Sequence, residues 1–471
     1  MAGPEVRLTA AWVLAALEPV HGAVVSGDMT RVFAGVSIDT RTLAAGDLFI
    51  AIRGERFDGS EFAQAAIDAG AAGVVVDRGR GRALDAKPGT VVVEAADTTA
   101  ALQALARAVR RASGTRVVAI TGSAGKTTTK EVTGEFLATR YTVVRNRGNL
   151  NNHIGLPLSL IELTARPDVA VVELGMNHAG EIRTLVGIAE PDVRVWTNVG
   201  DAHLEFFASI DALADAKAEI LEQATASSVL VCNSDDDRVR SRATAFAGRV
   251  ITFGMERPAT VHASAIVDSG VDGMAAHVST PHGVIDLKTP LVGRANLANV
   301  LAATAVALEM GISRSQIAET ARRIKPPAHR GDVLRLSKGI TVIDDSYNAN
   351  PTATHKALEL LAAARATRRV AVLGEMLELG ERSIELHERV GRAAPGRADV
   401  LIAVGGGPAA ALARAARDAG MAVDRVSHFP TIEAATEPVL GLLRAGDLVL
   451  VKGSRGVHTD RIVDRLKAEL A

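Results

Sequence analysis

Short apolar runs alternate with alanine-rich segments along the first quarter of the chain. The runs at 47–52, 73–77 and 90–94 contain mainly Val, Ile, Phe and Leu, which favour strands. The alanine-rich segments between them are predicted as helices. This pattern predicts a small α/β domain over residues 1–112.

A second and longer alternation begins with the apolar run 116–121. Further strands are predicted at 169–173, 193–198 and 229–233. These runs lack the polar alternation of a half-exposed strand, so they indicate a parallel sheet covered by helices on both faces. We expect this central domain to span residues 113–325.

Two consecutive prolines, Pro326 and Pro327, end that alternation, because proline can neither continue a helix nor donate to a sheet. Four further buried strands follow, at 341–345, 370–374, 400–405 and 447–452. Each is paired with a helical segment. The expected fold class is therefore α/β with three domains, of which the third, at 326–471, is Rossmann-like.

The composition excludes several classes of protein. The 53 Lys and Arg residues nearly cancel the 54 Asp and Glu residues, so we expect no nucleic-acid partner. One cysteine, Cys232, cannot form an internal disulfide and is typical of a reducing compartment. With 48% hydrophobic but 3% aromatic residues, the cores must consist mainly of aliphatic side chains.

The chain has no sequence typical of membrane insertion. The first apolar run, 10–17, is too short for a signal peptide, and Glu5 and Arg7 precede it. No uninterrupted apolar stretch reaches the length of a membrane span. We expect a cytoplasmic protein that acts as a monomer.

The most specific local motif lies between the strand at 116–121 and a helix at 129–138. It consists of Thr121, Gly122, Ser123, Ala124, Gly125, Lys126, Thr127 and Thr128. Glycines allow backbone N–H groups to surround phosphate oxygens, Lys126 adds a charge, and the Thr127 hydroxyl can ligate Mg²⁺. Ile120 occupies the position of the first glycine in the longer P-loop motif, so an ordinary glycine turn is the alternative. No Asn-Lys-x-Asp guanine motif exists, so ATP is the expected nucleotide.

Lys217 occupies an apolar position of a helix predicted from Ser209 to about Thr225. At about 100° per residue, it lies roughly 20° from Ile210 and 40° from Leu221 on the helix surface. A buried amine loses its charge, and a neutral amine can add CO₂ to form a carbamate that ligates Mg²⁺. Alternatively, the long stem carries the amine to solvent.

Glu173 and His203 follow predicted strands, where open parallel sheets bind their ligands. Either side chain alone could equally be structural.

Taken together, these residues resemble the Mur ligase family, the ATP-dependent amide ligases that build the peptidoglycan stem peptide. The motif at 121–128 is similar to the family's nucleotide loop, and the spacing from His203 to Lys217 is the same. The resemblance covers the whole chain and implies catalytic roles for Lys126, Glu173, His203 and Lys217. It also implies a Mg²⁺ site formed by Thr127, Glu173, His203 and a carbamate on Lys217.

Further stretches resemble the family member that adds D-alanyl-D-alanine to UDP-N-acetylmuramoyl-tripeptide through an acyl phosphate. The resemblance implies substrate contacts from Ser37, Asp39, Thr40, Arg41, Arg56, Phe57, Asp58, Asn149, Asn151, Asn152, Asn177, His178, Asn348, Asn350, Lys452, Ser454 and Arg455. It implies further ATP contacts from Asn296, Asn299, Arg330 and Asp345. Asp332 departs mildly from the family, which more often has Glu there. From spacing alone, many of these positions are also typical of plain turns.

Three alternative functions remain open. A sister ligase that adds a single amino acid is disfavoured, because 374–380 and 452–455 match the dipeptide-adding form and the Asp-Asn-Pro-Arg signature is absent. A folylpolyglutamate synthase would lack the uridine-binding first domain. A non-catalytic nucleotide-sugar sensor would not need the complete set of metal ligands.

Overall fold

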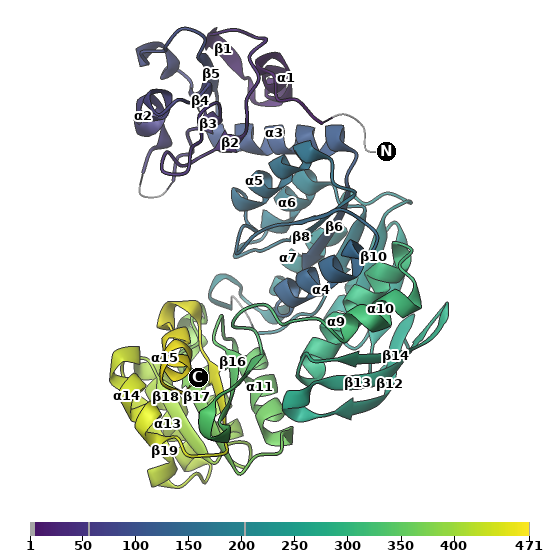
Figure 1. Cartoon of the computed structure of the whole chain (residues 1–471), viewed down its shortest axis with the longest axis vertical. Coiled ribbons are helices and arrows are strands. Elements are labelled where there is room, and N and C mark those ends of the chain that lie inside the picture. Colours follow the sequence, from purple (N-terminus) through teal and green to yellow (C-terminus); the bar gives the residue numbers. More distant parts are fainter. Residues whose placement is uncertain (1–4, 55–56, 202–203, 471) are drawn as a thin grey trace. The chain divides into compact units, whose positions relative to one another are not determined.

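The computed structural model describes residues 5–54, 57–201 and 204–470, and it divides into two compact units (Figure 1). Unit 1 comprises Met1–Ala119, Tyr141–Met176 and Gly180–Val193. Unit 2 comprises Ile120–Arg140, Asn177–Ala179 and Arg194–Ala471. The division falls within two strands, so the units are described separately below.

The N-terminal part of unit 1 is a five-stranded sheet in the order β1-β5-β4-β3-β2. Its strands are β1 Ala23–Ser26, β2 Val36–Ser37, β3 Leu48–Ile50, β4 Gly73–Asp77 and β5 Val91–Ala95. All neighbouring pairs are parallel except β1 and β5. Its helices are α1 Ala10–Ala16, η1 Glu18–Val20, η2 Gly59–Phe62, α2 Ala63–Asp68, η3 Gly81–Ala83 and α3 Thr98–Ser113. The three predicted strands are confirmed as β3, β4 and β5, whereas β1 and β2 were not predicted.

The remainder of unit 1 places three strands side by side in the order β6-β8-β7. They are β6 Arg116–Thr121, β7 Val143–Arg145 and β8 Val169–Glu173. The helices are α5 Gly155–Ile161, η4 Glu162–Ala165 and α6 Glu181–Ala189. Helix α3 packs against α5 and α6, and its Arg110 binds Asp192 at 2.8 Å.

In unit 2 the same sheet continues in the order β14-β13-β12-β11-β10-β9-β6. The strands are β9 Val193–Trp196, β10 Val229–Asn233, β11 Arg249–Gly254, β12 Val261–Asp268, β13 Met274–Thr280 and β14 Gly283–Thr289. β10, β11 and β12 run parallel, but β12, β13 and β14 are antiparallel. The expectation of a purely parallel central sheet is therefore wrong at this end of the sheet.

Within the described residues of unit 2, eight helical segments accompany these strands. They are α4 Lys126–Ala138, η5 Leu204–Phe206, α7 Ile210–Ala218, η6 Glu219–Leu221, α8 Asp237–Ala243, η7 Gly270–Asp272, α9 Gly293–Glu309 and α10 Arg314–Ala321. The helix predicted from Ser209 is shorter than expected, because α7 ends at Ala218 and continues only as the 3-10 turn η6. The proline segment at 325–327 has no regular secondary structure.

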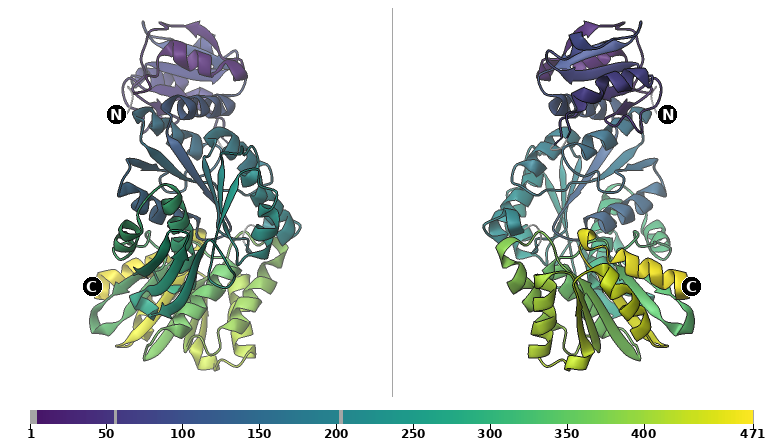
Figure 2. Two further views of the ribbon diagram at one scale, coloured as in Figure 1. Left: turned by 90° about the vertical axis from the view of Figure 1, so that its right-hand side faces the viewer. Right: turned by 90° about the vertical axis from the view of Figure 1, so that its left-hand side faces the viewer.

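The C-terminal part of unit 2 is a six-stranded sheet in the order β15-β16-β20-β17-β18-β19, parallel except at β15. Its strands are β15 Asp332–Arg335, β16 Thr341–Asp345, β17 Arg368–Gly374, β18 Val400–Val404, β19 Val426–Phe429 and β20 Asp447–Lys452. Its helices are η8 Ser337–Gly339, α11 Pro351–Ala363, η9 Gly380–Arg382, α12 Ser383–Ala393, α13 Gly407–Asp418, η10 Val423–Arg425, α14 Ile432–Leu442, η11 Arg455–Val457 and α15 Asp460–Leu470. Helices α14 and α15 bury Val439 and Leu466 in its core, and Figure 2 shows helices on both faces of this sheet. The four predicted strands and the α/β fold class are confirmed.

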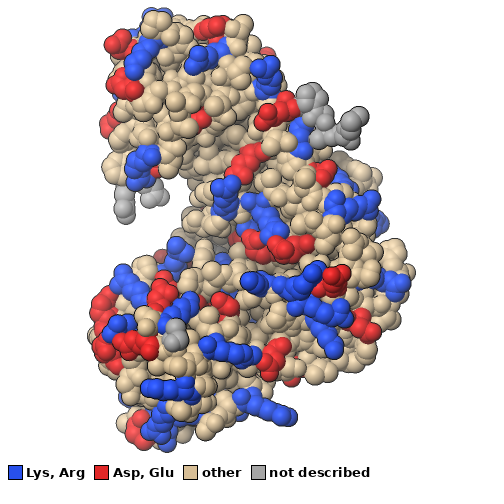
Figure 3. All heavy atoms as spheres, viewed as in Figure 1, with Lys and Arg blue, Asp and Glu red and all other residues tan. Residues whose placement is uncertain are grey.

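Charged side chains of both signs are interspersed over the visible face of the molecule (Figure 3). This agrees with the near-zero net charge of the sequence. Among the described residues, no helix combines the length and the apolar character needed to cross a bilayer.

Candidate functional site

The predicted phosphate loop joins β6 to α4, and two of its positions require glycine. Gly122 has φ +149°, and a Cβ there would lie 2.0 Å from the Thr197 Oγ1. Gly125 has φ +82°, and a Cβ there would lie 2.2 Å from the Asn299 Oδ1. Both positions combine a left-handed backbone with close packing, so a side chain at either would displace the loop.

The loop is held by the residues that follow β9. The Ser123 N–H donates to the Asn198 carbonyl oxygen at 3.0 Å, and the Ala124 N–H donates to the Asn198 Oδ1 at 2.9 Å. The Thr197 hydroxyl donates to the Ala124 carbonyl oxygen at 2.8 Å. The loop conformation is therefore fixed by the protein itself, as a preorganised phosphate site requires.

Two lysines converge on one carbonyl oxygen of this loop. The Lys126 Nζ lies 2.9 Å and the Lys217 Nζ 3.4 Å from the Gly122 oxygen. Lys217 is 1% exposed, which confirms that it points inward from α7. Burial, with a smaller contribution from the positive charge of Lys126, holds the pKa of Lys217 well below its usual range. The side chain therefore does not carry its amine to solvent, and a neutral amine is favoured.

Two asparagines predicted to contact ATP, Asn296 and Asn299, lie on the first turns of α9, beside the phosphate loop. The Asn299 Oδ1 accepts from the Thr129 hydroxyl of α4 at 3.3 Å, and its amide donates to the Asn296 Oδ1 at 3.2 Å. The Asn296 amide donates to the Val292 carbonyl oxygen at 2.9 Å. This chain of hydrogen bonds orients both amides and links α9 to α4.

Glu173 ends β8 within unit 1 and is almost fully buried. Its Oε1 accepts from the Asn151 amide at 2.8 Å, and its backbone N–H donates to the Asn146 Oδ1 at 2.9 Å. The Asn152 Oδ1 accepts from the N–H of Gly155, the first residue of α5, at 2.8 Å. The structure thus connects one predicted substrate residue, Asn151, with a predicted metal ligand. Asn146 was missed, although its place directly after a strand was a usable signal.

The other residues predicted in the middle domain, Asn149, Asn177 and His178, have contacts that do not indicate a ligand. The Asn149 carbonyl oxygen accepts from the Asn151 N–H at 2.7 Å, and the His178 ring packs 4.8 Å from the Phe206 ring. Asn177 precedes His178 in the same short segment of unit 2. His203 lies outside the described residues.

The predicted Mg²⁺ site is not matched by a cluster of acidic, histidine or cysteine side chains in the part of the chain that the structure describes. Within residues 5–54, 57–201 and 204–470, no group of three or more His, Cys, Asp and Glu side chains could hold a metal ion. Two of the four predicted ligands, Thr127 and Lys217, are of other types, and His203 is outside those ranges. The four-residue Mg²⁺ site remains a prediction.

Predicted site residues of the third sheet gather at the carboxyl ends of its strands. The Lys452 Nζ binds the Asp345 carboxylate at 2.7 Å and the Asn348 carbonyl oxygen at 2.9 Å. The Asn350 Oδ1 caps α11 by accepting from the Ala353 N–H. The Ser454 hydroxyl, which is buried, donates to the Ala349 carbonyl oxygen at 3.3 Å. These contacts join the loops after β16 and β20.

An aromatic ring between two arginines completes this edge. The Arg330 guanidinium lies 3.9 Å and that of Arg455 5.2 Å from the centre of the Tyr347 ring. Such cation–π contacts hold flexible guanidiniums in place. Tyr347 was not among the predicted site residues, because its partners come from separate loops.

The predicted uridine-binding residues form two small polar turns at the first sheet. The Ser37 hydroxyl donates to the Asp39 carbonyl oxygen at 3.0 Å, and next to Thr40 the Arg41 guanidinium holds the pKa of Asp39 down at about 2. Asp58 pairs with Arg53 at 3.1 Å.

The aromatic side chain of the second turn is open to solvent. Phe57 is 68% exposed, and its ring centre lies 6.4 Å from that of Phe62. Arg56 lies outside the described residues. An exposed ring beside paired charges suits a base and a diphosphate, but the contacts themselves are equally those of stable turns.

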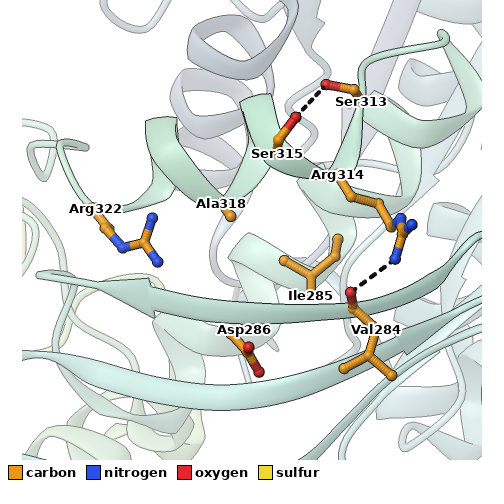
Figure 4. A pocket seen from close by; sticks show the side chains of 8 residues that line it. All are labelled: Val284, Ile285, Asp286, Ser313, Arg314, Ser315, Ala318 and Arg322. Carbon is orange, nitrogen blue, oxygen red and sulfur yellow. Dashed lines mark hydrogen bonds between the residues drawn. The ribbon is translucent and has the colours of Figure 1, made fainter.

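A separate pocket of about 560 Å³ lies between α10 and β14 (Figure 4). Arg314 at the start of α10 and Arg322 just after its end line the pocket, and Arg314 donates to the Val284 carbonyl oxygen at 3.2 Å. None of its lining residues belongs to the predicted site. We therefore assign the function to the phosphate loop and not to this pocket.

Three protein-family models match the chain. They describe the Mur ligase family catalytic domain at residues 32–112, the Mur ligase middle domain at 120–307, and the Mur ligase glutamate ligase domain at 329–455. The UDP-N-acetylmuramoyl-tripeptide–D-alanyl-D-alanine ligase of Bacillus subtilis is 33% identical over 92% of this chain and 93% of its own length.

Solved structures are similar over nearly the whole chain as well. MurF from Acinetobacter baumannii superposes with a TM-score of 0.88 at 30% identity, covering 99% of this chain and all of that one. MurF from Thermotoga maritima, solved with ADP, gives 0.81 at 27% identity and covers 92% and 97% of the two chains. With the phosphate loop and the buried lysine in place, these matches establish that the chain belongs to the Mur ligase family.

Proposed function

We propose that this chain is an ATP-dependent ligase that joins D-alanyl-D-alanine to UDP-N-acetylmuramoyl-tripeptide and releases ADP and phosphate. The observation that supports it best is the buried Lys217 amine, which meets Lys126 at the Gly122 carbonyl oxygen of the phosphate loop. The relatives matched over more than nine-tenths of the chain bear this name. A sister ligase, a folylpolyglutamate synthase or a nucleotide-sugar sensor has no comparable support.

ATP is proposed to bind with its phosphates in the loop at 121–128. Thr197 and Asn198 hold the conformation of this loop, and Lys126 supplies a positive charge to the transferred phosphoryl group. Asn296 and Asn299 are proposed at the adenine, and Arg330 and Asp345 at the ribose and phosphates. The MurF of Thermotoga maritima, which was solved with ADP, supports the binding of an adenine nucleotide.

The proposed ligands have the chemistry that Mg²⁺ binds, namely a hydroxyl, a carboxylate, an imidazole and carbamate oxygens. A lysine amine that burial keeps neutral can take up CO₂, and the resulting carbamate offers oxygen ligands. Thr127, Glu173, His203 and the carbamylated Lys217 would then hold the ion. When bound, Mg²⁺ neutralises charge on the phosphate oxygens.

The proposed reaction has two steps. A carboxylate oxygen of the tripeptide attacks the γ-phosphorus of ATP, which forms an acyl phosphate as ADP leaves. The dipeptide amine then attacks the acyl carbon, phosphate leaves with the bonding electron pair, and the nitrogen loses a proton. Because phosphoryl transfer needs mainly charge compensation and in-line positioning, fixed loops and Lys126 are suited to it.

The substrates are proposed to occupy three regions that match the predicted domains 1–112, 113–325 and 326–471. The polar turns at Ser37–Arg41 and Arg56–Asp58 would hold the uridine diphosphate, and the asparagines near Glu173 would hold the peptide. The edge formed by Asn348, Lys452 and Arg455 would hold the dipeptide. We place the reaction in the cytoplasm, where ATP and nucleotide sugars are available, and keep the monomer as a prediction.

An isotope experiment tests the acyl phosphate. Tripeptide substrate labelled with ¹⁸O in its terminal carboxylate should transfer one ¹⁸O to the released phosphate, because that oxygen bridges carbon and phosphorus in the intermediate. Mass spectrometry of the phosphate provides the readout. Unlabelled phosphate accompanied by ligated product would rule out this route.

A further inference from the structure

His387 is completely buried in the first turns of α12, and both of its ring nitrogens have a backbone partner. The Nδ1 lies 2.7 Å from the Ser383 carbonyl oxygen, one helical turn earlier. The Nε2 lies 2.9 Å from the Met376 backbone nitrogen, which belongs to the loop after β17. The imidazole therefore connects α12 to that loop.

These two partners determine the form of the ring. A backbone carbonyl can only accept and a backbone N–H can only donate, so the Nδ1 carries the proton and the Nε2 accepts. In a doubly protonated ring the Nε2–H and the Met376 N–H would both be donors, and the hydrogen bond between them would be lost. Glu375 is the charged group that acts on the ring, and it favours protonation, whereas the stronger effect of burial opposes it. The neutral imidazole is the form that holds the loop.

The Met376 loop is joined to three other segments at the same sheet edge. The Glu375 N–H donates to the Val404 carbonyl oxygen at 2.8 Å, and the Leu377 N–H donates to the Ser454 hydroxyl at 2.9 Å. The Thr354 hydroxyl lies 3.6 Å from the Met376 sulfur. Because Ser454 in turn binds the loop at Ala349, a shift of Met376 would be transmitted to the loops after β16 and β20.

The loop also has a surface that can touch a ligand. The Met376 side chain is buried, but Leu377 is 42% exposed at the same edge as Lys452 and Arg455. The Met376 N–H is the point at which α12 fixes this exposed turn. A ligand at the edge would thus contact residues whose positions depend on His387.

We propose that His387 is a positioning residue for the amine substrate, holding the loop at 375–379 in the arrangement that binds D-alanyl-D-alanine. This inference rests on the proposed function, which places the dipeptide at this sheet edge. The imidazole does not touch the substrate. Its effect should therefore be specific to the dipeptide and should spare ATP and the nucleotide-linked tripeptide.

The test compares His387→Leu, which lacks an acceptor, with His387→Gln, whose amide oxygen can accept the Met376 N–H. We expect His387→Leu to raise the KM for D-alanyl-D-alanine at least tenfold, with less than twofold change in the KM for ATP and for UDP-muramoyl-tripeptide. His387→Gln should recover most of the loss. If His387→Leu does not fold, His387→Gln must still show a rise in the KM for the dipeptide alone, although a smaller one.

A matched control separates positioning from general instability. Leu466→Ala removes a buried side chain of α15 in the same sheet's core and should lower Tm without raising the dipeptide KM selectively. An unchanged dipeptide KM in the His387 variants, or a rise shared by all three substrates, would overturn the proposal. Failure of the unsubstituted protein to turn over with the dipeptide would instead refute the proposed function.

Discussion

The position of Lys217 was predictable from its angle on a helix, but its burial was not. The sequence indicated an inward direction, and a long side chain could still have reached solvent. Its amine instead ends at the Gly122 carbonyl oxygen, inside the protein, where burial lowers its pKa. Whether the amine is buried or reaches solvent depends on the packing around α7, which cannot be predicted from the local sequence.

Replacing this lysine should abolish ligation. Lys217→Arg places a permanent positive charge where burial keeps the lysine amine neutral, and it cannot form a carbamate, so we expect at least a hundredfold loss of kcat. Lys467→Arg on α15 is the control. Incubation with ¹³C-bicarbonate should also give a carbamate signal by NMR in the unsubstituted protein and in the control, but not in Lys217→Arg. An active Lys217→Arg enzyme would contradict the role.

The phosphate-loop glycines allow a second residue-scale prediction. Gly122→Ala places a methyl group 2.0 Å from the Thr197 Oγ1 in a left-handed backbone, so ATP affinity should fall at least tenfold and Tm should drop. Gly441→Ala in α14 meets no atom within 4 Å and should be neutral or stabilise by up to about 1 kcal/mol. Isothermal titration and thermal unfolding measure both. Equal behaviour of the two variants would contradict the packing argument.

At the scale of single elements, β17 and β20 are joined by a buried ion pair. The Arg368 guanidinium donates to Asp447 at 2.6 and 2.9 Å, and Asp447 also accepts from the Arg444 N–H at 2.7 Å. Asp447→Ala leaves a largely buried guanidinium without its carboxylate partner and should lower the free energy of unfolding by about 3 kcal/mol. Denaturant unfolding tests this, with the exposed Asp464→Ala as the control. A decrease of less than about 1 kcal/mol in the free energy of unfolding would contradict this and indicate that water replaces the carboxylate as the partner of Arg368.

Helix α12 should make stability depend on pH. Burial lowers the pKa of His387 below its ordinary value of 6.5. Just below pH 6.5, His387 is therefore protonated in the unfolded chain but stays neutral in the folded protein. This destabilising effect is absent well above pH 6.5, and the folded protein loses stability as the pH falls below 6.5. Compared with His387→Gln, the unsubstituted protein should lose more stability between pH 7 and 5 in denaturant titrations. Parallel curves would contradict a neutral, buried ring.

The strands differ in how well the sequence predicted them. Continuous apolar runs such as β8 and β10 were predictable because both faces are covered. β13 and β14 alternate buried and exposed residues, as at Ile285, Asp286 and Leu287, which is typical of a half-exposed antiparallel strand. That signal was present and was not used. β2 has two residues, too few for any period to be recognised.

For the whole molecule, the order of domains was accessible from the sequence, but the joining of distant segments was not. Motifs predicted the phosphate loop and the proposed substrate turns because their residues are adjacent in the chain. Contacts such as Arg455 with Tyr347, or Met376 with His387, unite separate loops, so they depend on the finished sheet. The residues missed by sequence reasoning, Asn146, Tyr347 and His387, are of this second kind.

The most direct test of the account is ADP release by the purified protein with ATP, Mg²⁺, UDP-muramoyl-tripeptide and D-alanyl-D-alanine, each omitted in turn. Because the dipeptide amine completes the reaction, we predict sustained ADP release only when all four are present. Sustained release with a single amino acid in place of the dipeptide would contradict the proposed specificity. No release under any combination would contradict the assignment of this chain as a ligase.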